Sequence, residues 1–148
     1  MDVKKVYDYN SNILNYRRKE GTEYYLELRE KVTIIDGDSS TGKTLLVNDL
    51  SNTKKSGASL TGLDLSNVVI VETDTDIGID SKILYITDRA DMFLNDAICD
   101  RICGYTKARF LIFARGDYKL GVSPNHFGEF KKKANTISIE YAFNESWW

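Results

Sequence analysis

The feature that most constrains this chain of 148 residues is a glycine-rich segment in its first third. The segment fits G-x-x-x-x-G-K-[ST] without a departure and reads Gly37, Asp38, Ser39, Ser40, Thr41, Gly42, Lys43 and Thr44. Apolar residues lie on both sides of it: Val32, Ile34 and Ile35 before, and Leu45, Leu46, Val47 and Leu50 at helical spacing after. A strand, a glycine-rich loop and a helix in this order direct backbone N–H groups and the positive end of a helix dipole at one point. The sequence therefore predicts a loop at residues 37–44 that binds the phosphates of a nucleotide.

Two side chains of this loop have the chemistry that such a site needs. Lys43 is expected to reach the β- and γ-phosphates, and the hydroxyl of Thr44 to ligate Mg²⁺. A chance glycine-rich turn is the alternative, and the flanking strand and helix disfavour it. At these residues the chain resembles the P-loop NTPase superfamily. The resemblance implies ATP and Mg²⁺ as cofactors.

A second pattern supports the first. Residues 83–87 are four apolar residues and a threonine, and Asp88 follows them. This resembles the Walker B strand, whose aspartate holds Mg²⁺ through water at the carboxyl end of the sheet. Many hydrolysing members of the superfamily have a glutamate next, where this chain has Arg89. Asp91 is the nearest acid that could polarise a water molecule, and a helix N-cap or first-turn acid is its alternative role.

A third strand is predicted at residues 110–114, followed by Arg115. Its position after the Walker B-like strand resembles the sensor strand of the additional-strand ATPases. Arg115 is therefore a candidate phosphate sensor or arginine acting in cis, and a surface arginine at a strand end is the equal alternative. The family also often stacks an aromatic side chain from a preceding strand on the base. Tyr24 or Tyr25 is the candidate here, against an ordinary core or surface role.

The remaining patterns complete the expected fold. Period-2 alternation predicts strands at residues 24–29 and 136–143, a β-branched run predicts one at 68–71, and a helix is expected from Ser123 through Lys133. We expect a minimal P-loop NTPase fold, a three-layer α/β sandwich with a mostly parallel sheet and an antiparallel edge strand. Residues 1–20 are expected to form a polar N-terminal segment and residues 21–148 one nucleotide-binding domain. The chain resembles small ATP-binding proteins of the additional-strand or ABC-like type in phages and mobile elements of Gram-positive bacteria.

Composition restricts the partners. A net charge of −2 gives no overall basic field, so nucleic acid is not indicated, and the cluster Arg17, Arg18 and Lys19 is interpreted as solvated surface. No apolar run approaches a membrane span, and Cys99 and Cys103 fit reduced thiols, which together predict a cytoplasmic protein with no membrane partner. The adjacent Trp147 and Trp148 predict a protein partner or self-association, or else a cover for the edge of the sheet.

These observations predict a protein that binds ATP and Mg²⁺ and hydrolyses ATP slowly or only with a partner. Such a protein acts as a nucleotide switch or as one component of a larger assembly. ATP is favoured over GTP because the guanine-specific N/T-K-x-D pattern is absent; residues 106–109 lack its aspartate. The alternative is a phage- or plasmid-encoded regulatory or inhibitory binding module on a P-loop scaffold. A small-molecule kinase ranks last, because too few candidates exist for lid arginines and an acceptor pocket.

Overall fold

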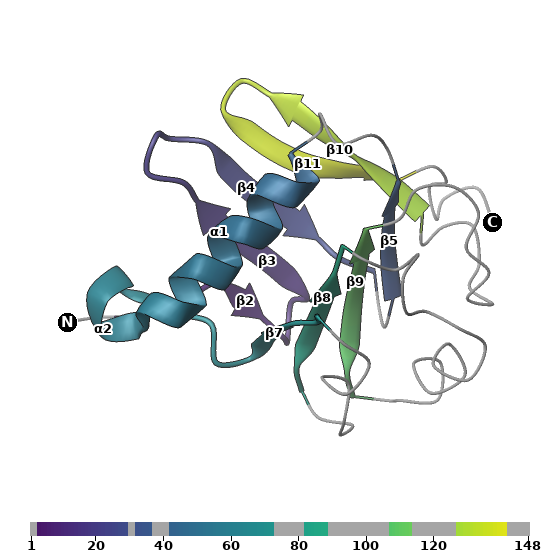
Figure 1. The fold of residues 1–148 in the computed structure, drawn as a ribbon. Helices are drawn as coiled ribbons and strands as arrows, with labels where there is room; N and C mark the ends of the chain where they lie inside the picture. The colour runs from purple at the N-terminus through teal and green to yellow at the C-terminus, as the bar shows by residue number, and fades with distance from the viewer. Residues whose placement is uncertain are drawn as a thin grey trace.

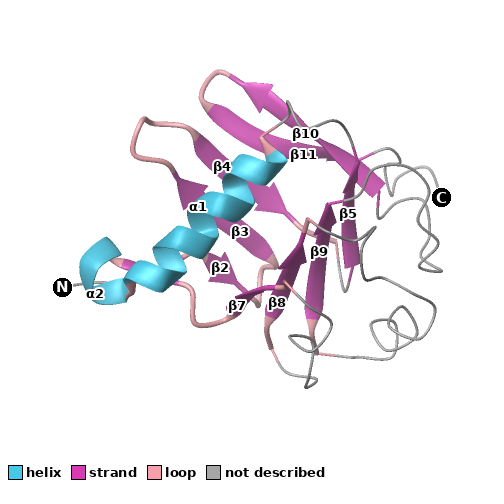
Figure 2. Cartoon of the chain, in the orientation of Figure 1, coloured by secondary structure: helices cyan, strands magenta, loops and turns pink. Residues whose placement is uncertain are grey.

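Strands dominate the architecture of this protein (Figures 1 and 2). The computed structural model describes residues 3–29, 32–36, 42–72, 82–88, 107–113 and 127–141. Within these ranges there are eleven strands and two helices. The strands are β1 (Lys4–Lys5), β2 (Tyr7–Asp8), β3 (Ile13–Arg17), β4 (Glu23–Glu27), β5 (Val32–Asp36), β6 (Leu63–Asp64), β7 (Val68–Ile70), β8 (Leu84–Thr87), β9 (Arg109–Phe113), β10 (Phe127–Lys133) and β11 (Thr136–Tyr141). The helices are α1 (Lys43–Ser56) and α2 (Ala58–Thr61).

Nine of the strands form one mixed sheet in the order β2-β3-β4-β11-β10-β5-β9-β8-β7, and β1 pairs with β6 in a separate parallel pair. The pairs β2–β3, β3–β4 and β10–β11 are antiparallel, and the strands from β10 to β7 run parallel to one another. The sheet curves until its two edges approach, which makes it a nearly closed, barrel-like sheet. Asn67, just before β7, donates from Nδ2 to the carbonyl oxygen of Tyr7 in β2 at 2.8 Å.

The expected fold, a helix-rich three-layer α/β sandwich of the minimal P-loop type, is wrong. Among the described residues the protein is mostly β, and α1 is its one long helix. Two hairpins that the sequence patterns did not predict, β2–β3 and β10–β11, account for much of the difference. Residues 1–20 contribute β1, β2 and β3 instead of a separate polar segment, and the end of the helix expected up to Lys133 is strand β10.

For the strand predicted at residues 68–71, the short connection that follows it left two arrangements open: antiparallel to its sequence neighbour, or at the edge of the sheet. The strand exists as β7 and lies at the edge of the sheet, but it runs parallel to β8, with Val68 opposite Leu84 and Ile70 opposite Ile86. The strands predicted around residues 24–29, 83–87, 110–114 and 136–143 are confirmed as β4, β8, β9 and β11, with ends that differ by a few residues.

The core lies between α1 and the face of the sheet that it crosses (Figure 1). Leu46 and Leu50 on α1 are fully buried. They belong to one cluster with side chains of the strands on both halves of the sheet, such as Leu26, Leu84 and Leu111. Because burying each such side chain contributes about 1.5–3 kcal/mol, this contact positions α1 on the sheet.

Candidate functional site

The glycine-rich segment connects the centre of the sheet to the start of α1. β5 ends at Asp36 and lies between β10 and β9, and α1 begins at Lys43. Gly37, Asp38, Ser39, Ser40 and Thr41 lie outside the described residues. The strand before the segment and the helix after it are confirmed.

Gly42 has a backbone conformation that the helix start requires. Its φ of 91° and ψ of 8° lie in the left-handed region, where glycine carries no steric cost. Its carbonyl oxygen accepts the hydroxyl of Tyr24 at 3.0 Å and the backbone N–H of Leu46 at 3.1 Å. A Cβ at this position would lie 3.1 Å from the Tyr24 hydroxyl oxygen and 3.6 Å from Cδ1 of Ile137. Glycine is therefore required both by the backbone angles and by the close packing.

The N-terminus of α1 presents groups that favour an anion. No side chain caps the helix at Gly42, and its first turn contains no acidic residue. The first N–H groups of a helix lack partners within the helix and carry its positive dipole end. Lys43 is only 4% exposed, while Thr44 is exposed. A lysine and the positive end of the helix dipole therefore lie at the same end of α1.

Tyr24 supports this helix start from β4. Its ring is fully buried, stacked on Tyr16 with centroids 6.4 Å apart and edge-on to Phe130 at 6.0 Å. Burial raises the pKa of the Tyr24 hydroxyl, and the hydroxyl donates a hydrogen bond to the carbonyl oxygen of Gly42. A ring enclosed in this way has no free face for a base. Tyr25 is 40% exposed, and its side chain alternates with that of buried Tyr24 along β4.

Asp88 lies directly after β8, which is separated from β5 by β9. Since β5, β9, β8 and β7 are parallel, the residues that follow them lie at the same edge of the sheet. Asp88 and Glu72 line a hollow of about 330 Å³ whose opposite wall is α1, at Asn48 and Ser51. The structure therefore places Asp88 beside the middle of α1.

Two predicted catalytic residues, Asp91 and Arg115, lie outside the described residues, and so do Trp147 and Trp148. Within the described ranges no group of three or more His, Cys, Asp or Glu side chains gathers in a way that could hold a metal ion. Sequence reasoning missed the hydrogen bond from Tyr24 to Gly42. The alternation in β4 showed that Tyr24 is buried, but no local pattern shows which distant carbonyl a buried hydroxyl meets.

In the part of the chain that the structure describes, no helix has the length and apolar character needed to cross a membrane. No protein-family model matches the chain, no curated protein is significantly similar to it, and no solved structure matches its fold.

Proposed function

We propose that this chain binds ATP with Mg²⁺ at the start of α1 and acts as a nucleotide switch or as a component of a larger assembly. The observation that carries the proposal is the uncapped helix N-terminus that begins with left-handed Gly42 and buried Lys43. Three features fit a phosphate chain: the positive end of the α1 dipole, a lysine at the first helical position, and a glycine in the left-handed conformation before it.

Each residue has a role that its position permits. Lys43 binds the β- and γ-phosphates as a point charge, and the exposed hydroxyl of Thr44 orients Mg²⁺. Asp88, across the hollow beside α1, would hold Mg²⁺ through water, since Mg²⁺ typically takes one or two carboxylates together with phosphate oxygens. When bound, Mg²⁺ neutralises the charge that develops on the phosphates. ATP is proposed over GTP because the guanine-specific motif is missing.

Slow or partner-dependent hydrolysis follows from the residue after Asp88. Arg89 stands where many hydrolysing relatives of this motif have the glutamate that polarises water. Among the described residues, Glu72 is the further carboxylate that lines the hollow with Asp88. It follows the neighbouring strand β7 and is exposed to solvent. A partner protein that supplies the missing carboxylate at this edge of the sheet would complete the site.

The test is Lys43→Met, which removes the charge but keeps an apolar stem in the buried position. ATP affinity measured by calorimetry with Mg²⁺ is expected to fall at least tenfold, about 1.4 kcal/mol. Lys54→Met is the matched control, because Lys54 is on the last turn of the same helix and donates to the carbonyl oxygen of Val68. The control is expected to bind ATP as the wild type does.

The same samples report turnover. Steady-state hydrolysis by the isolated wild type is expected well below the enzyme median of about 10 s⁻¹. Equal ATP affinity for wild type and Lys43→Met, or no ATP binding by the wild type, would refute the proposed site. Brisk hydrolysis would refute only the proposal that a partner is needed.

A further inference from the structure

Two basic segments that are more than a hundred residues apart in sequence lie side by side in the fold. Residues 17–19 form the end of β3 and the turn into β4, and residues 131–133 form the end of β10 before the turn into β11. β11 and β4 are paired in parallel, with Thr136 opposite Glu23, and the Glu23 N–H donates to the Asn135 carbonyl at 2.7 Å. The two turns are therefore neighbours at one end of the sheet (Figure 1).

Four cations of these segments, which we call the basic tip, remain available to a ligand. They are Arg17, Lys19, Lys132 and Lys133, all exposed, and none forms an ion pair with another described residue. Such a concentration is unusual in a chain whose net charge is −2. The net charge of the whole chain does not reveal this group of cations, because acidic residues outnumber basic ones in the rest of the chain.

The other two cations have structural partners. Arg18 donates from Nε to Asp49 at 2.6 Å and lies 3.6 Å from Glu20. Lys131 pairs with Glu140 at 3.5 Å. Three nearby acids, Glu20, Asp49 and Glu140, are thus paired with these two cations, and Glu23 accepts a hydrogen bond from Asn15.

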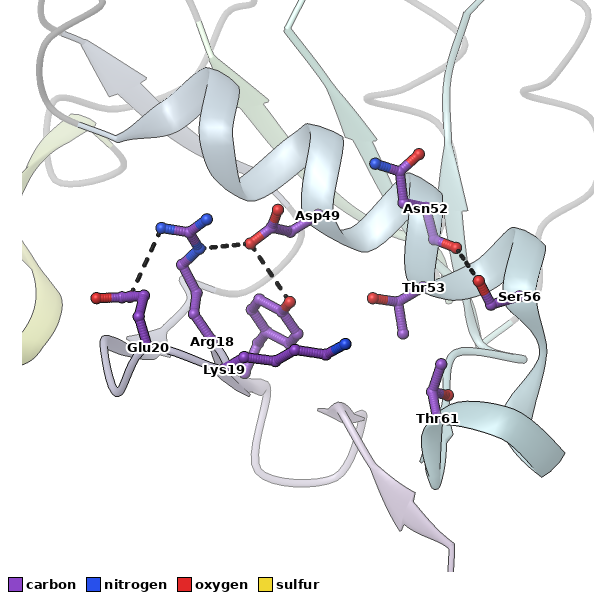
Figure 3. Close-up of a pocket in the computed structure, with 9 residues that line it drawn as sticks. Arg18, Lys19, Glu20, Asp49, Asn52, Thr53, Ser56 and Thr61 are labelled. Carbon is purple, nitrogen blue, oxygen red and sulfur yellow. Dashed lines mark hydrogen bonds and ion pairs between the residues drawn. The ribbon is translucent and has the colours of Figure 1, made fainter.

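The turn that carries Lys19 is rigidly held. Its backbone is closed by hydrogen bonds from Arg18 N–H to the Thr22 carbonyl at 2.7 Å and from Gly21 N–H to the Arg18 carbonyl at 3.0 Å. The ion pair from Arg18 to Asp49 joins the turn to α1 (Figure 3). A cation on a pre-organised turn loses less entropy on binding than one on a mobile loop.

A cleft of about 380 Å³ opens between this turn and α1 (Figure 3). Tyr16, Arg18, Lys19 and Glu20 line it on the side of the turn, and the helices contribute Asp49, Asn52, Thr53, Ser56 and Thr61. The two carboxylates in this lining, Glu20 and Asp49, both pair with Arg18. The pKa of Glu20 is lowered chiefly by hydrogen bonds from Thr22. The positive charges of Arg18 and Lys132 lower it further. The pairing of β4 with β11 brings the second basic segment to the same end of the sheet as the turn that lines the cleft.

We propose that the basic tip and this cleft bind single-stranded nucleic acid without sequence preference. Cations, hydroxyls and amides are the groups that contact phosphates and sugars, and such contacts carry no sequence information. A single strand fits better than a duplex, because its bases are free to turn outward and one nucleotide can enter the cleft. The site is separate from the start of α1, so it does not depend on ATP binding.

The experiment is fluorescence anisotropy of a labelled mixed-sequence DNA strand of about 20 nucleotides, titrated with the full chain at several salt concentrations. If the four cations neutralise four phosphates, the slope of log K against log salt concentration is expected to be about −3. The binding constant then falls roughly 50-fold between about 50 and 200 mM salt. Lys132→Gln with Lys133→Gln is expected to reduce the slope by about 1.4. Lys5→Gln with Lys82→Gln, which removes the same charge from exposed positions elsewhere, is expected to leave it unchanged.

Several outcomes overturn the proposal. They are no salt-dependent binding of the strand, equal losses in the two double variants, tighter binding of a duplex of the same length, and binding to phosphatidylserine vesicles in place of the strand. Thermal melts of both variants verify that each folds as the wild type does. The titration contains no ATP, so its result is independent of the proposed nucleotide site.

Discussion

At the scale of single residues, two neighbouring tyrosines differ in what their hydroxyl groups contact. Tyr16 on β3 and Tyr24 on β4 are opposite one another in the antiparallel ladder, and both rings are buried against α1. The hydroxyl of Tyr24 meets the carbonyl of Gly42 at 3.0 Å, whereas that of Tyr16 meets Asp49, two turns further along the helix, at 3.4 Å. Only the Tyr24 hydroxyl contacts the residue that precedes Lys43.

Tyr24→Phe is therefore expected to weaken ATP binding while Tyr16→Phe is not. Each variant removes one hydroxyl and keeps the ring, so packing with Phe130 is retained. Loss of a neutral hydrogen bond is worth about 0.5–1.5 kcal/mol, which predicts a twofold to tenfold loss of affinity in Tyr24→Phe if the bond holds the helix start in its binding geometry. Calorimetry and thermal melts of both variants measure this. Equal affinities for the two variants would show that the Tyr24 hydroxyl only stabilises the fold.

At the scale of elements, the β10–β11 hairpin shows a local conflict between sequence and backbone. Its strands are joined by two residues, Ala134 and Asn135, between the paired positions Lys133 and Thr136. Ala134 has a φ of 55°, a value that favours glycine. The turn is nevertheless formed, because the hairpin is held by β5 on one side and β4 on the other.

Ala134→Gly is expected to raise stability. Relief of the positive φ gains about 1–2 kcal/mol and the more flexible unfolded chain costs about 0.5–1, so the net gain is about 0.5 kcal/mol. In a chain of this size that corresponds to a rise in Tm of roughly 1–2 °C. Gly62→Ala is the reverse control: its φ is 71°, and a Cβ there would meet nothing within 4 Å, so only the backbone strain is added. A fall in Tm for Ala134→Gly would contradict this account.

The elements also show how far sequence reasoning reaches. Strands β4, β8, β9 and β11 and helix α1 were predicted because alternation, apolar runs and helical spacing are local signals. β10 was mistaken for part of a helix, because Phe127 and Phe130 are spaced as on a helix face. Its strand state is set by pairing with β5 and β11, which are distant in sequence. A local sequence pattern does not show which distant strands a segment will pair with.

The candidate site was predictable to a similar degree. Its residue types and their order came from the sequence, and so did the strand and helix that flank the loop. The support from Tyr24, the hollow shared by Asp88 and Glu72, and the meeting of the two basic segments came only from the fold, because each depends on sheet order.

At the scale of the whole molecule, the hydroxyl groups of Tyr7 and Tyr141 both donate hydrogen bonds within the folded chain. Tyr7 on β2 is fully buried and donates to Oδ1 of Asn12 at 2.6 Å. Tyr141 at the end of β11 donates to the carbonyl of Glu27 on β4 at 2.5 Å, and the guanidinium of Arg29 lies 4.0 Å from the centre of its ring. Burial raises the pKa of the Tyr7 hydroxyl and raises that of Tyr141 to about 12.

These raised values predict that the fold loses stability in alkali. A tyrosine whose pKa is 10 when unfolded and about 12 when folded binds its proton more tightly in the folded state. Its contribution is fully present below pH 10 and is lost as the pH rises through 12. The free energy of unfolding should therefore fall between pH 10 and 12, by at most about 1.4 kcal/mol per pH unit for each such group. Urea unfolding at pH 9, 10 and 11 measures the slope, and absorbance at 295 nm follows tyrosine ionisation.

Tyr141→Phe isolates this effect from the other titratable groups of the chain. The variant has every lysine of the wild type, so the difference between the two slopes belongs to Tyr141 alone. Its slope between pH 10 and 11 should be shallower than that of the wild type, because the group that must lose a proton is gone. Parallel slopes would mean that Tyr141 titrates as it does in an unfolded chain, and that the contact between β11 and β4 at Glu27 leaves the hydroxyl open to water.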